Sequence, residues 1–176
     1  MPTLFTAGYG SWPAANRLSG LIAALREANV TTLVDIRHSP CSSNLIVGHT
    51  YGPKDWHLQS QAGGLPHHLE QVGLAYRWLV ELGNPQKNDP QMQILREHLA
   101  SGLDLWPVNR GLKQLAELLH ESAARVCVMC ACEDYDHCHR RLVAEVVSYR
   151  YFDRGLGIVD LSRAGARTIE SGRSED

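Results

Sequence analysis

The sequence lacks a marked excess of charge of either sign and contains no long hydrophobic run. Its 17 Lys and Arg residues nearly balance its 19 Asp and Glu residues, which gives a formal net charge of -2. This balance gives no electrostatic reason to expect tight, sequence-independent DNA binding, although a local basic patch could still bind nucleic acid. No apolar segment approaches membrane-spanning length, and residues 1–10 lack the basic segment and apolar core of a signal peptide. We therefore expect a cytoplasmic protein with no membrane partner.

Internal repeats, linkers and paired Cys-x-x-Cys knuckles are also absent from the sequence. Its 176 residues are 44% hydrophobic and 20% charged, which is typical of a soluble globular domain that can bury its own core. We predict one domain over residues 1–161, followed by a flexible polar tail over residues 162–176. The five cysteines are an odd number, and four of them lie between positions 127 and 138. This grouping favours a reducing compartment and a local site over a disulfide framework.

The hydrophobic pattern switches repeatedly between strand-like and helical periods. Strand-like segments lie at residues 3–7, 31–37, 74–80, 126–129 and 157–161. Helical patterns alternate with them, starting after a possible N-cap at Ser11 and continuing at residues 66–72, 91–100, 111–122 and 142–153. This order predicts an α/β fold with a mainly parallel sheet of about five strands and helices on both faces.

Chemically capable side chains follow the ends of four expected strands. Ligands of parallel sheets bind outside the carboxyl ends of the strands, so these residues could line one crevice. The groups are Gly8, Tyr9 and Gly10; Asp35 and Arg37; Glu81, Gly83 and Asn84; and Cys130, Cys132 and Glu133. From these groups we expect ligand binding by Gly8, Tyr9, Gly10, Arg37, Asn84 and Cys132.

The candidate catalytic residues lie around the last of these strands. Cys138, His139 and Arg140 fall where a helix opens after the strand. The positive end of a helix and cationic neighbours lower the pKa of a thiol, so a reactive Cys138 thiolate is a candidate nucleophile. Asp35 and Glu133 are the candidate general acid and base.

The same residues have structural alternatives. Cys138 could pack under the turn instead of reacting, and Asp136 has a simple role available as the N-cap of the helix. Asp35 could fix the crevice through a salt bridge to Arg37, Arg140 or Arg141.

The cysteines also allow a metal site. Cys127 and Cys130 are three positions apart in a strand and so point to opposite faces, which makes Cys127 an expected buried residue rather than a ligand. Cys130 and Cys132 share a face. With Cys138 and either His137 or His139 they could form a thiolate and imidazole site. The sequence assigns no cofactor.

Residues 38–64 show no periodicity over an unusually long stretch, which is typical of a lid, a binding loop or a disordered segment. Tyr51 and Trp56 could stack on a base or form the small core of the loop. One of the histidines in and after this stretch, His49, His57, His67 or His68, could close on the site.

Several short motifs in this order resemble the DUF488 family, a set of bacterial and archaeal domains of unknown function. They are Gly8-Tyr9-Gly10, the VDIRHSP run at 34–40, LGNP at 82–85, and Cys-x-Cys-Glu followed by Cys138-His139-Arg140. The resemblance spans roughly residues 3–150 and implies a single α/β domain with a shared polar crevice. It departs at residues 41–44, where the family usually has a Ser-Arg pair and then an aromatic, so it implies no basic contact there.

Three hypotheses of function follow. The first is an enzyme that acts on a small-molecule or nucleotide-like ligand in the crevice. The second is a metal-binding or redox-sensing domain that uses Cys130, Cys132 and Cys138 as ligands. The third is a nucleic-acid-binding module that uses Arg37, Arg140, Arg141 and the aromatic loop.

Overall fold

The computed structural model describes residues 2–38, 64–84, 89, 91–121 and 124–169. Most of the predicted binding loop, including His49, Tyr51, Trp56 and His57, lies outside these ranges. Among the described residues, no helix is both long enough and apolar enough to cross a lipid bilayer.

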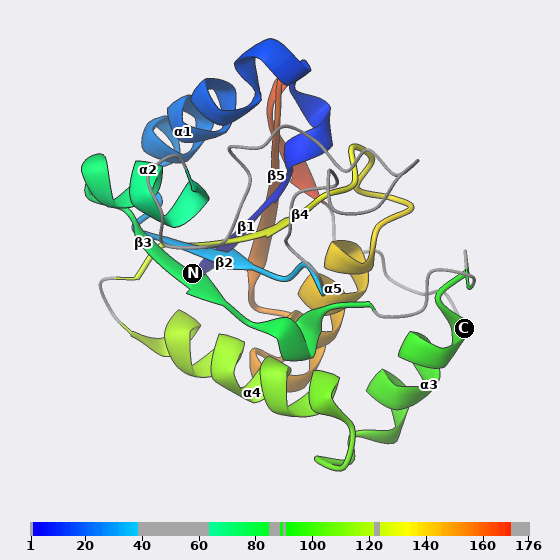
Figure 1. Cartoon of the computed structure of the whole chain (residues 1–176). Coiled ribbons are helices and arrows are strands. Elements are labelled where there is room, and N and C mark those ends of the chain that lie inside the picture. The colour runs from blue at the N-terminus through cyan, green and yellow to red at the C-terminus, as the bar shows by residue number, and fades with distance from the viewer. Residues whose placement is uncertain (1, 39–63, 85–88, 90, 122–123, 170–176) are drawn as a thin grey trace.

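A six-stranded sheet lies at the centre of the described structure, with the strand order β3-β2-β4-β1-β5-β6 (Figure 1). Strands β1 to β5 are parallel, and β6 runs antiparallel to β5. Their bounds are Thr3–Gly8 (β1), Thr32–Asp35 (β2), Ala75–Trp78 (β3), Val126–Cys130 (β4), Gly157–Ser162 (β5) and Gly165–Ile169 (β6). The predicted α/β fold with a mainly parallel sheet is confirmed, with one strand more than expected.

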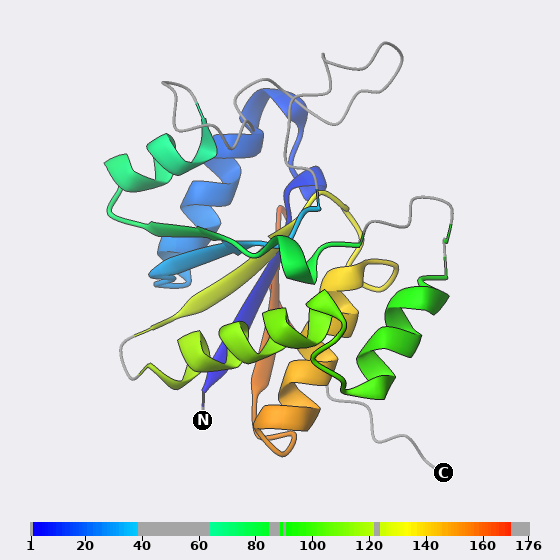
Figure 2. The ribbon, with the colours of Figure 1, turned by 60° about the horizontal axis from the view of Figure 1, so that its bottom comes forward.

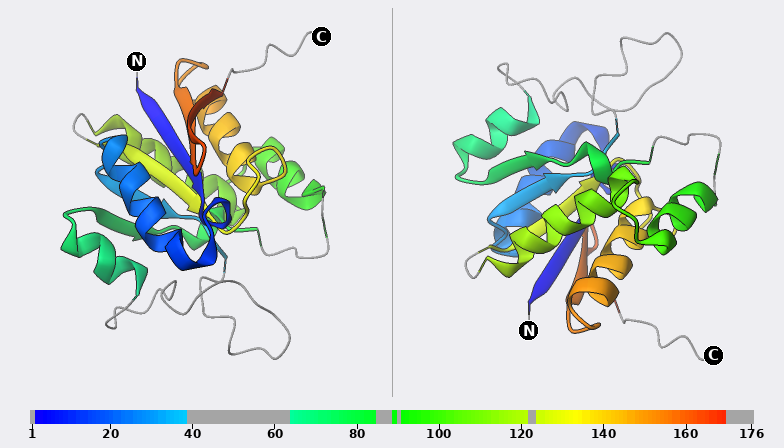
Figure 3. Two further views of the ribbon diagram at one scale, coloured as in Figure 1. Left: turned by 90° about the horizontal axis from the view of Figure 1, so that it is seen from above. Right: turned by 90° about the horizontal axis from the view of Figure 1, so that it is seen from below.

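Helices of the described residues cover both faces of the sheet, as predicted (Figure 2, Figure 3). One face carries α1 and α2, whose leucines share a core with β1 and β2. The opposite face carries α3, α4 and α5, which form the larger core. The bounds are Arg17–Glu27 (α1), Leu65–Gln71 (α2), Gln93–Ser101 (α3), Pro107–His120 (α4) and His139–Tyr151 (α5).

Strand β4 is buried on both faces, because it lies between β2 and β1 in the middle of the sheet. Val128 and Cys130 belong to the core under α4 and α5, whereas Cys127 and Met129 belong to the core under α1 and α2. The continuous apolar run of the sequence thus matches a strand covered twice. Cys127 points away from Cys130, as the sequence spacing predicted.

The prediction of a flexible tail from residue 162 is wrong as far as Ile169. Ser162 ends β5, and β6 pairs with β5 from Ser162↔Gly165 to Ile158↔Ile169. Gly165 has a φ of 107, a conformation that favours glycine, at the start of β6. Strand β6 is an exposed edge strand. Because backbone pairing rather than burial holds it, its sequence shows no apolar alternation.

The first helix begins later than Ser11. Two short 3₁₀ turns, at Tyr9–Ser11 and Ala14–Asn16, precede α1, and the Ser11 side chain caps neither. Trp12 is buried between these turns. A Cβ on Gly20 would lie 2.3 Å from the Trp12 ring, so this side chain packs directly on the α1 backbone. The N-cap residue of α1, Asn16, likewise makes no side-chain cap.

The loops after β1 and β4 touch at the carboxyl edge of the sheet. The chain leaves β1 toward α1 on one face and leaves β4 toward α5 on the other, an arrangement at which ligand sites form in α/β sheets (Figure 1). A Cβ on Gly8 would lie 1.9 Å from the Cys132 carbonyl oxygen, and one on Gly10 would lie 2.9 Å from the Ala131 carbonyl oxygen. The glycine turn therefore allows close approach of the β4–α5 loop.

We expect Gly8→Ala to lower the free energy of unfolding by about 1–3 kcal/mol, because the new methyl group would overlap backbone and force the two loops apart. Gly157→Ala is the matched control, since a Cβ there meets nothing closer than 3.6 Å. Urea denaturation of both variants checks this prediction. Equal stability of the two variants would contradict the close approach of the β4–α5 loop to Gly8.

Candidate functional site

Four possible metal ligands gather at the carboxyl end of β4 and the start of α5. They are Cys130, Cys132, Cys138 and His139, and their ligand atoms all lie within 4.8 Å of one another. Cys130 and Cys138 are buried, His139 is half-buried and Cys132 is exposed. The structure thus brings together the predicted Cys138 and His139 with both cysteines of the Cys-x-Cys motif. We call these four residues the cysteine cluster.

Backbone amides surround the sulfur atoms of the cysteine cluster. The Cys132 N–H donates to Cys130 Sγ at 3.3 Å, and the Arg140 N–H donates to Cys138 Sγ at 3.4 Å. The two buried sulfur atoms lie 2.7 Å apart.

Cys138 is the N-cap of α5, because its sulfur accepts the hydrogen bond from the Arg140 N–H. The prediction that Asp136 is the N-cap is wrong, because α5 begins at His139 and the Cys138 sulfur accepts the Arg140 N–H.

The ring of His139 contacts the backbone of Ile36, the residue that directly follows β2. Its Nε2 lies 3.0 Å from the Ile36 carbonyl oxygen, and its Nδ1 lies 3.8 Å from Cys138 Sγ. A carbonyl oxygen only accepts hydrogen bonds, so Nε2 carries a proton and donates it to Ile36. This bond fixes the ring with Nδ1 facing the sulfur atoms.

The electrostatics of the cluster separate the two buried thiols. Burial opposes ionisation of Cys138, but hydrogen bonds from Cys130, Cys132 and His139 outweigh it and lower the pKa of the Cys138 thiol strongly. Burial, together with hydrogen bonds to Cys132 and Cys138, raises the pKa of Cys130. Burial opposes protonation of His139, but its bonds to Cys132 and Cys138 raise the pKa to about 10. The pKa values of the two buried thiols are thus shifted in opposite directions.

Arg140 braces the loop that carries the cluster. The side chain is fully buried. Its Nη1 donates to Cys130 Sγ at 3.3 Å and to the Cys132 carbonyl oxygen at 3.1 Å, and Nη2 donates to the Glu133 carbonyl oxygen at 3.2 Å. Its Nε lies 3.5 Å from Asp160 Oδ1, which also accepts a hydrogen bond from Thr6 at 2.6 Å. The predicted Cys138, His139 and Arg140 therefore do meet, and Arg140 acts on the backbone around the sulfurs.

Asp35 forms a buried ion pair with Arg37. Oδ1 of the fully buried carboxylate accepts hydrogen bonds from the Arg37 backbone N–H and from Arg37 Nε, both at 2.9 Å. Oδ2 accepts the Tyr76 hydroxyl at 3.0 Å, and the Trp78 indole donates to the Arg37 carbonyl oxygen at 2.9 Å. Of the alternatives that the sequence left open for Asp35, the structure shows the salt bridge to Arg37. No pattern in the sequence indicates the contacts of Tyr76 and Trp78 with this ion pair.

The remaining residues expected to bind ligand lie around this edge of the sheet. Tyr9 is buried with its ring 5.3 Å from the Arg37 guanidinium, and burial raises the pKa of its hydroxyl. The space above Gly8 is filled by the β4–α5 loop. Asn84 follows a 3₁₀ turn at Val80–Leu82, and the preceding Gly83 packs on His38. Ligand binding by these residues stays a prediction.

The arginines expected to bind nucleic acid are already engaged. Arg37 is 7% exposed and Arg140 is fully buried, each in contact with a carboxylate. Arg141 pairs with Glu145 at 2.7 Å on the surface of α5. A phosphate backbone requires exposed cations, so these contacts do not favour the nucleic-acid hypothesis.

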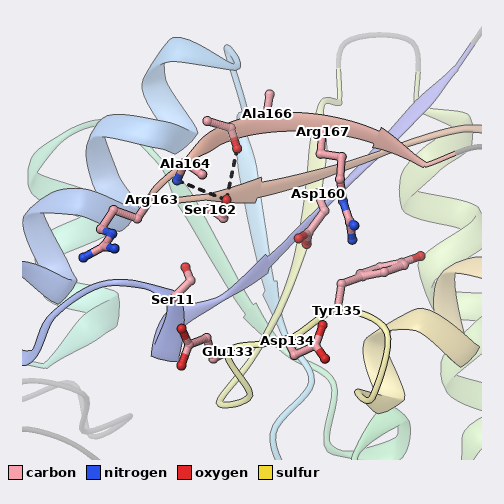
Figure 4. A pocket seen from close by; sticks show the side chains of 11 residues that line it. Ser11, Glu133, Asp134, Tyr135, Asp160, Ser162, Arg163, Ala164, Ala166 and Arg167 are labelled. Atoms are coloured by element: carbon pink, nitrogen blue, oxygen red, sulfur yellow. Dashed lines mark hydrogen bonds between the residues drawn. The ribbon is translucent and has the colours of Figure 1, made fainter.

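A cavity of about 390 Å³ opens beside the β4–α5 loop. Figure 4 shows Asp160 and Ser162 of β5 on one side and Ser11, Glu133 and Asp134 on the other. Ser11 Oγ is buried without a hydrogen-bond partner among the described residues. Sequence reasoning found Glu133 but missed Asp160. A single carboxylate inside the apolar run of β5 was the available signal.

Comparison with known proteins identifies the family of this chain. A family model described as "Domain of unknown function DUF488" matches residues 53–147, more than half of the chain. The chain therefore belongs to the DUF488 family, as its motifs indicated. The matched region contains the whole cysteine cluster. Searches of curated proteins and of solved structures find no match.

We expect Asp35→Asn to lower the free energy of unfolding by about 3–5 kcal/mol, because it leaves the buried Arg37 guanidinium without a compensating charge. Tyr76→Phe is the matched control, since it removes one hydrogen bond from the same carboxylate and should cost about 1–2 kcal/mol. Chemical denaturation measures both. A loss for Asp35→Asn no larger than that of the control would show that the ion pair is dispensable.

Proposed function

We propose that this DUF488 protein is a metal-binding domain whose cysteine cluster holds one zinc ion through three sulfur atoms and one imidazole. The observation that carries the proposal is the convergence of four ligand atoms within 4.8 Å. Three cysteines with one histidine are a common ligand set of structural zinc sites.

The surroundings of the ligands support this proposal. Metal-bound imidazoles usually donate their second N–H to a carbonyl or carboxylate, as His139 Nε2 does to Ile36. N–H groups directed at Cys130 Sγ and Cys138 Sγ stabilise the thiolate forms that bind a metal. Arg140 adds a positive charge next to Cys130 Sγ, which offsets the excess negative charge of three thiolates on a divalent ion.

Zinc requires a modest opening of the cluster. With zinc–sulfur bonds of about 2.3 Å, tetrahedral geometry separates two sulfur ligands by about 3.8 Å. The 3.8 Å between His139 Nδ1 and Cys138 Sγ is close to the spacing of such a site. The Cys130 and Cys138 sulfurs, at 2.7 Å, must move apart by about 1 Å. Cys132 lies in an exposed loop and can adjust.

Four protein ligands leave no open coordination position, so the zinc would be structural. It would fasten the end of β4 to the start of α5 and hold the loop that forms one wall of the neighbouring cavity. Cys138 is only 1% exposed, which favours this role over attack on a substrate by its thiolate.

We expect about one zinc per chain in protein purified under reducing conditions without chelator, measured by mass spectrometry of the metal. Cys138→Ser and His139→Gln should each lose most of it, because three ligands hold zinc less tightly than four. Cys127→Ala should retain it, since Cys127 lies on the opposite face of β4. A strong chelator should lower the melting temperature of the parent protein. Folded protein that neither contains nor takes up zinc would overturn the proposal.

Binding of a small polar molecule in the 390 Å³ cavity is a second candidate function. The observation that favours it is the set of three carboxylates around this space, from Glu133, Asp134 and Asp160. Carboxylates accept hydrogen bonds from hydroxyl groups and repel phosphate. The three carboxylates outnumber the two arginines of the lining, Arg163 and Arg167, so a ribose fits this cavity better than a phosphate group does. A ligand hydroxyl would also give Ser11 Oγ a partner.

We expect adenosine to bind more tightly than adenosine monophosphate in calorimetric titrations of the zinc-loaded protein. Glu133→Gln should weaken adenosine binding, because it removes a hydrogen-bond acceptor for the ligand without disturbing the core. It should also reduce the difference in affinity between adenosine and adenosine monophosphate, because it removes one negative charge near the ligand. Glu117→Gln on α4 is the control and should change neither. Absence of adenosine binding at millimolar concentration, or tighter binding of the monophosphate, would rule this function out.

A further inference from the structure

We propose that the cysteine cluster is also a site of thiol oxidation, in which a small-molecule disulfide reacts at Cys132 and the reaction ends with a Cys130–Cys138 disulfide. The release of metal that would accompany it rests on the proposed zinc site. The oxidation itself does not, because it depends only on how the three sulfurs lie.

The exposure of the cysteines determines which thiol an oxidant reaches first. Among the described cysteines, Cys132 alone is exposed, whereas Cys127, Cys130 and Cys138 are buried. Thiol–disulfide exchange needs access to the attacking sulfur. A small disulfide therefore reaches Cys132 before it can reach either buried partner.

The distances between the sulfur atoms determine which disulfide is the final product. Cys130 Sγ and Cys138 Sγ lie 2.7 Å apart, whereas a disulfide bond measures about 2.05 Å, so little movement joins them. Cys132 Sγ lies within 4.8 Å of both and can pass the oxidation inward. Cys127 belongs to the core on the other side of the sheet and takes no part.

The chemistry balances with a disulfide oxidant such as oxidised glutathione. The Cys132 thiolate attacks one sulfur of the oxidant, forming a mixed disulfide and releasing one glutathione thiolate. The Cys138 thiolate then attacks the Cys132 sulfur and releases the second glutathione thiolate. Finally the Cys130 sulfur attacks the Cys138 sulfur while its thiol proton passes to the departing Cys132 sulfur, which returns Cys132 to a thiol. Two electrons thus pass from Cys130 and Cys138 to the oxidant.

Loss of two ligands would break the zinc site. A disulfide sulfur is no longer a thiolate and does not hold zinc, so the ion would retain at most Cys132 and His139. Arg140 would also lose its charged partner at Cys130 Sγ. The cluster would therefore convert the presence of an oxidant into release of metal and loosening of the β4–α5 loop.

The test uses Cys41→Ser protein, which removes the one cysteine outside the described residues, in zinc-loaded and metal-free forms. Each form is treated with oxidised glutathione. Zinc release is followed with a chromogenic chelator, and disulfides are mapped by mass spectrometry of unreduced peptides. We expect release of the bound zinc together with a Cys130–Cys138 disulfide and little retained glutathione.

Two variants test the order of events in the metal-free form, where loss of a zinc ligand has no influence. Cys132→Ser should slow formation of the internal disulfide by about tenfold or more, because the remaining thiols are buried. Cys130→Ser should halt the reaction at a Cys132–Cys138 disulfide. Cys127→Ala should react at the rate of the parent.

The outcomes separate this inference from the zinc proposal. A Cys130–Cys138 disulfide in protein that never binds zinc would overturn the zinc site and support the oxidation. Zinc-loaded protein that keeps its metal, or metal-free protein with only a glutathione adduct at Cys132, would overturn the oxidation. Unchanged kinetics in Cys132→Ser would also overturn it, because Cys132 would not be the entry point.

Discussion

The site depends on one physical requirement, which is that the buried Arg140 guanidinium must find partners inside the protein. A buried charge is very costly unless it is paired and hydrogen-bonded. Arg140 meets most of this requirement through an ion pair with Asp160 and hydrogen bonds to a cysteine sulfur and to the carbonyl oxygens of Cys132 and Glu133. Its Nε makes no hydrogen bond among the described residues. The same contacts set the path of the β4–α5 loop. The position of Cys132, the wall of the cavity and the need for a glycine at residue 8 all follow from that path.

Local sequence was enough to predict the central part of the fold. The continuous apolar run of β4 can only suit a strand covered on both faces, and the change to helical spacing after residue 141 marks α5. The two-residue period of β2 correctly placed Asp35 and Arg37 together. Cys138, His139 and Arg140 could be grouped because they are consecutive, and the meeting of Cys130 with Cys138 followed from a strand and a helix joined by a short loop.

Features that depend on contacts between distant segments could not be predicted in the same way. Asp160 joins the site through Arg140 and Thr6, and nothing near residue 160 in the sequence indicates either partner. Strand β6 forms because β5 offers a free edge, not because its own residues are apolar. The N-cap of α5 is Cys138 and not Asp136, because the helix begins at His139. Each of these features depends on the folded structure and not on the local sequence pattern.

The hydrogen bond from Thr6 to Asp160, which also contacts Arg140, spans almost the whole chain, because Thr6 and Asp160 are 154 positions apart in the sequence. Strand β5 follows β1 to β4 along the chain but pairs directly with β1. Contacts of such wide sequence separation form slowly, since a long loop must close before they stabilise anything. Until β5 arrives, a nascent chain carries Arg140 without its carboxylate and the cysteine loop without its brace. The contacts that hold Arg140, and through it the cysteine loop, are therefore complete only once β5 has paired with β1.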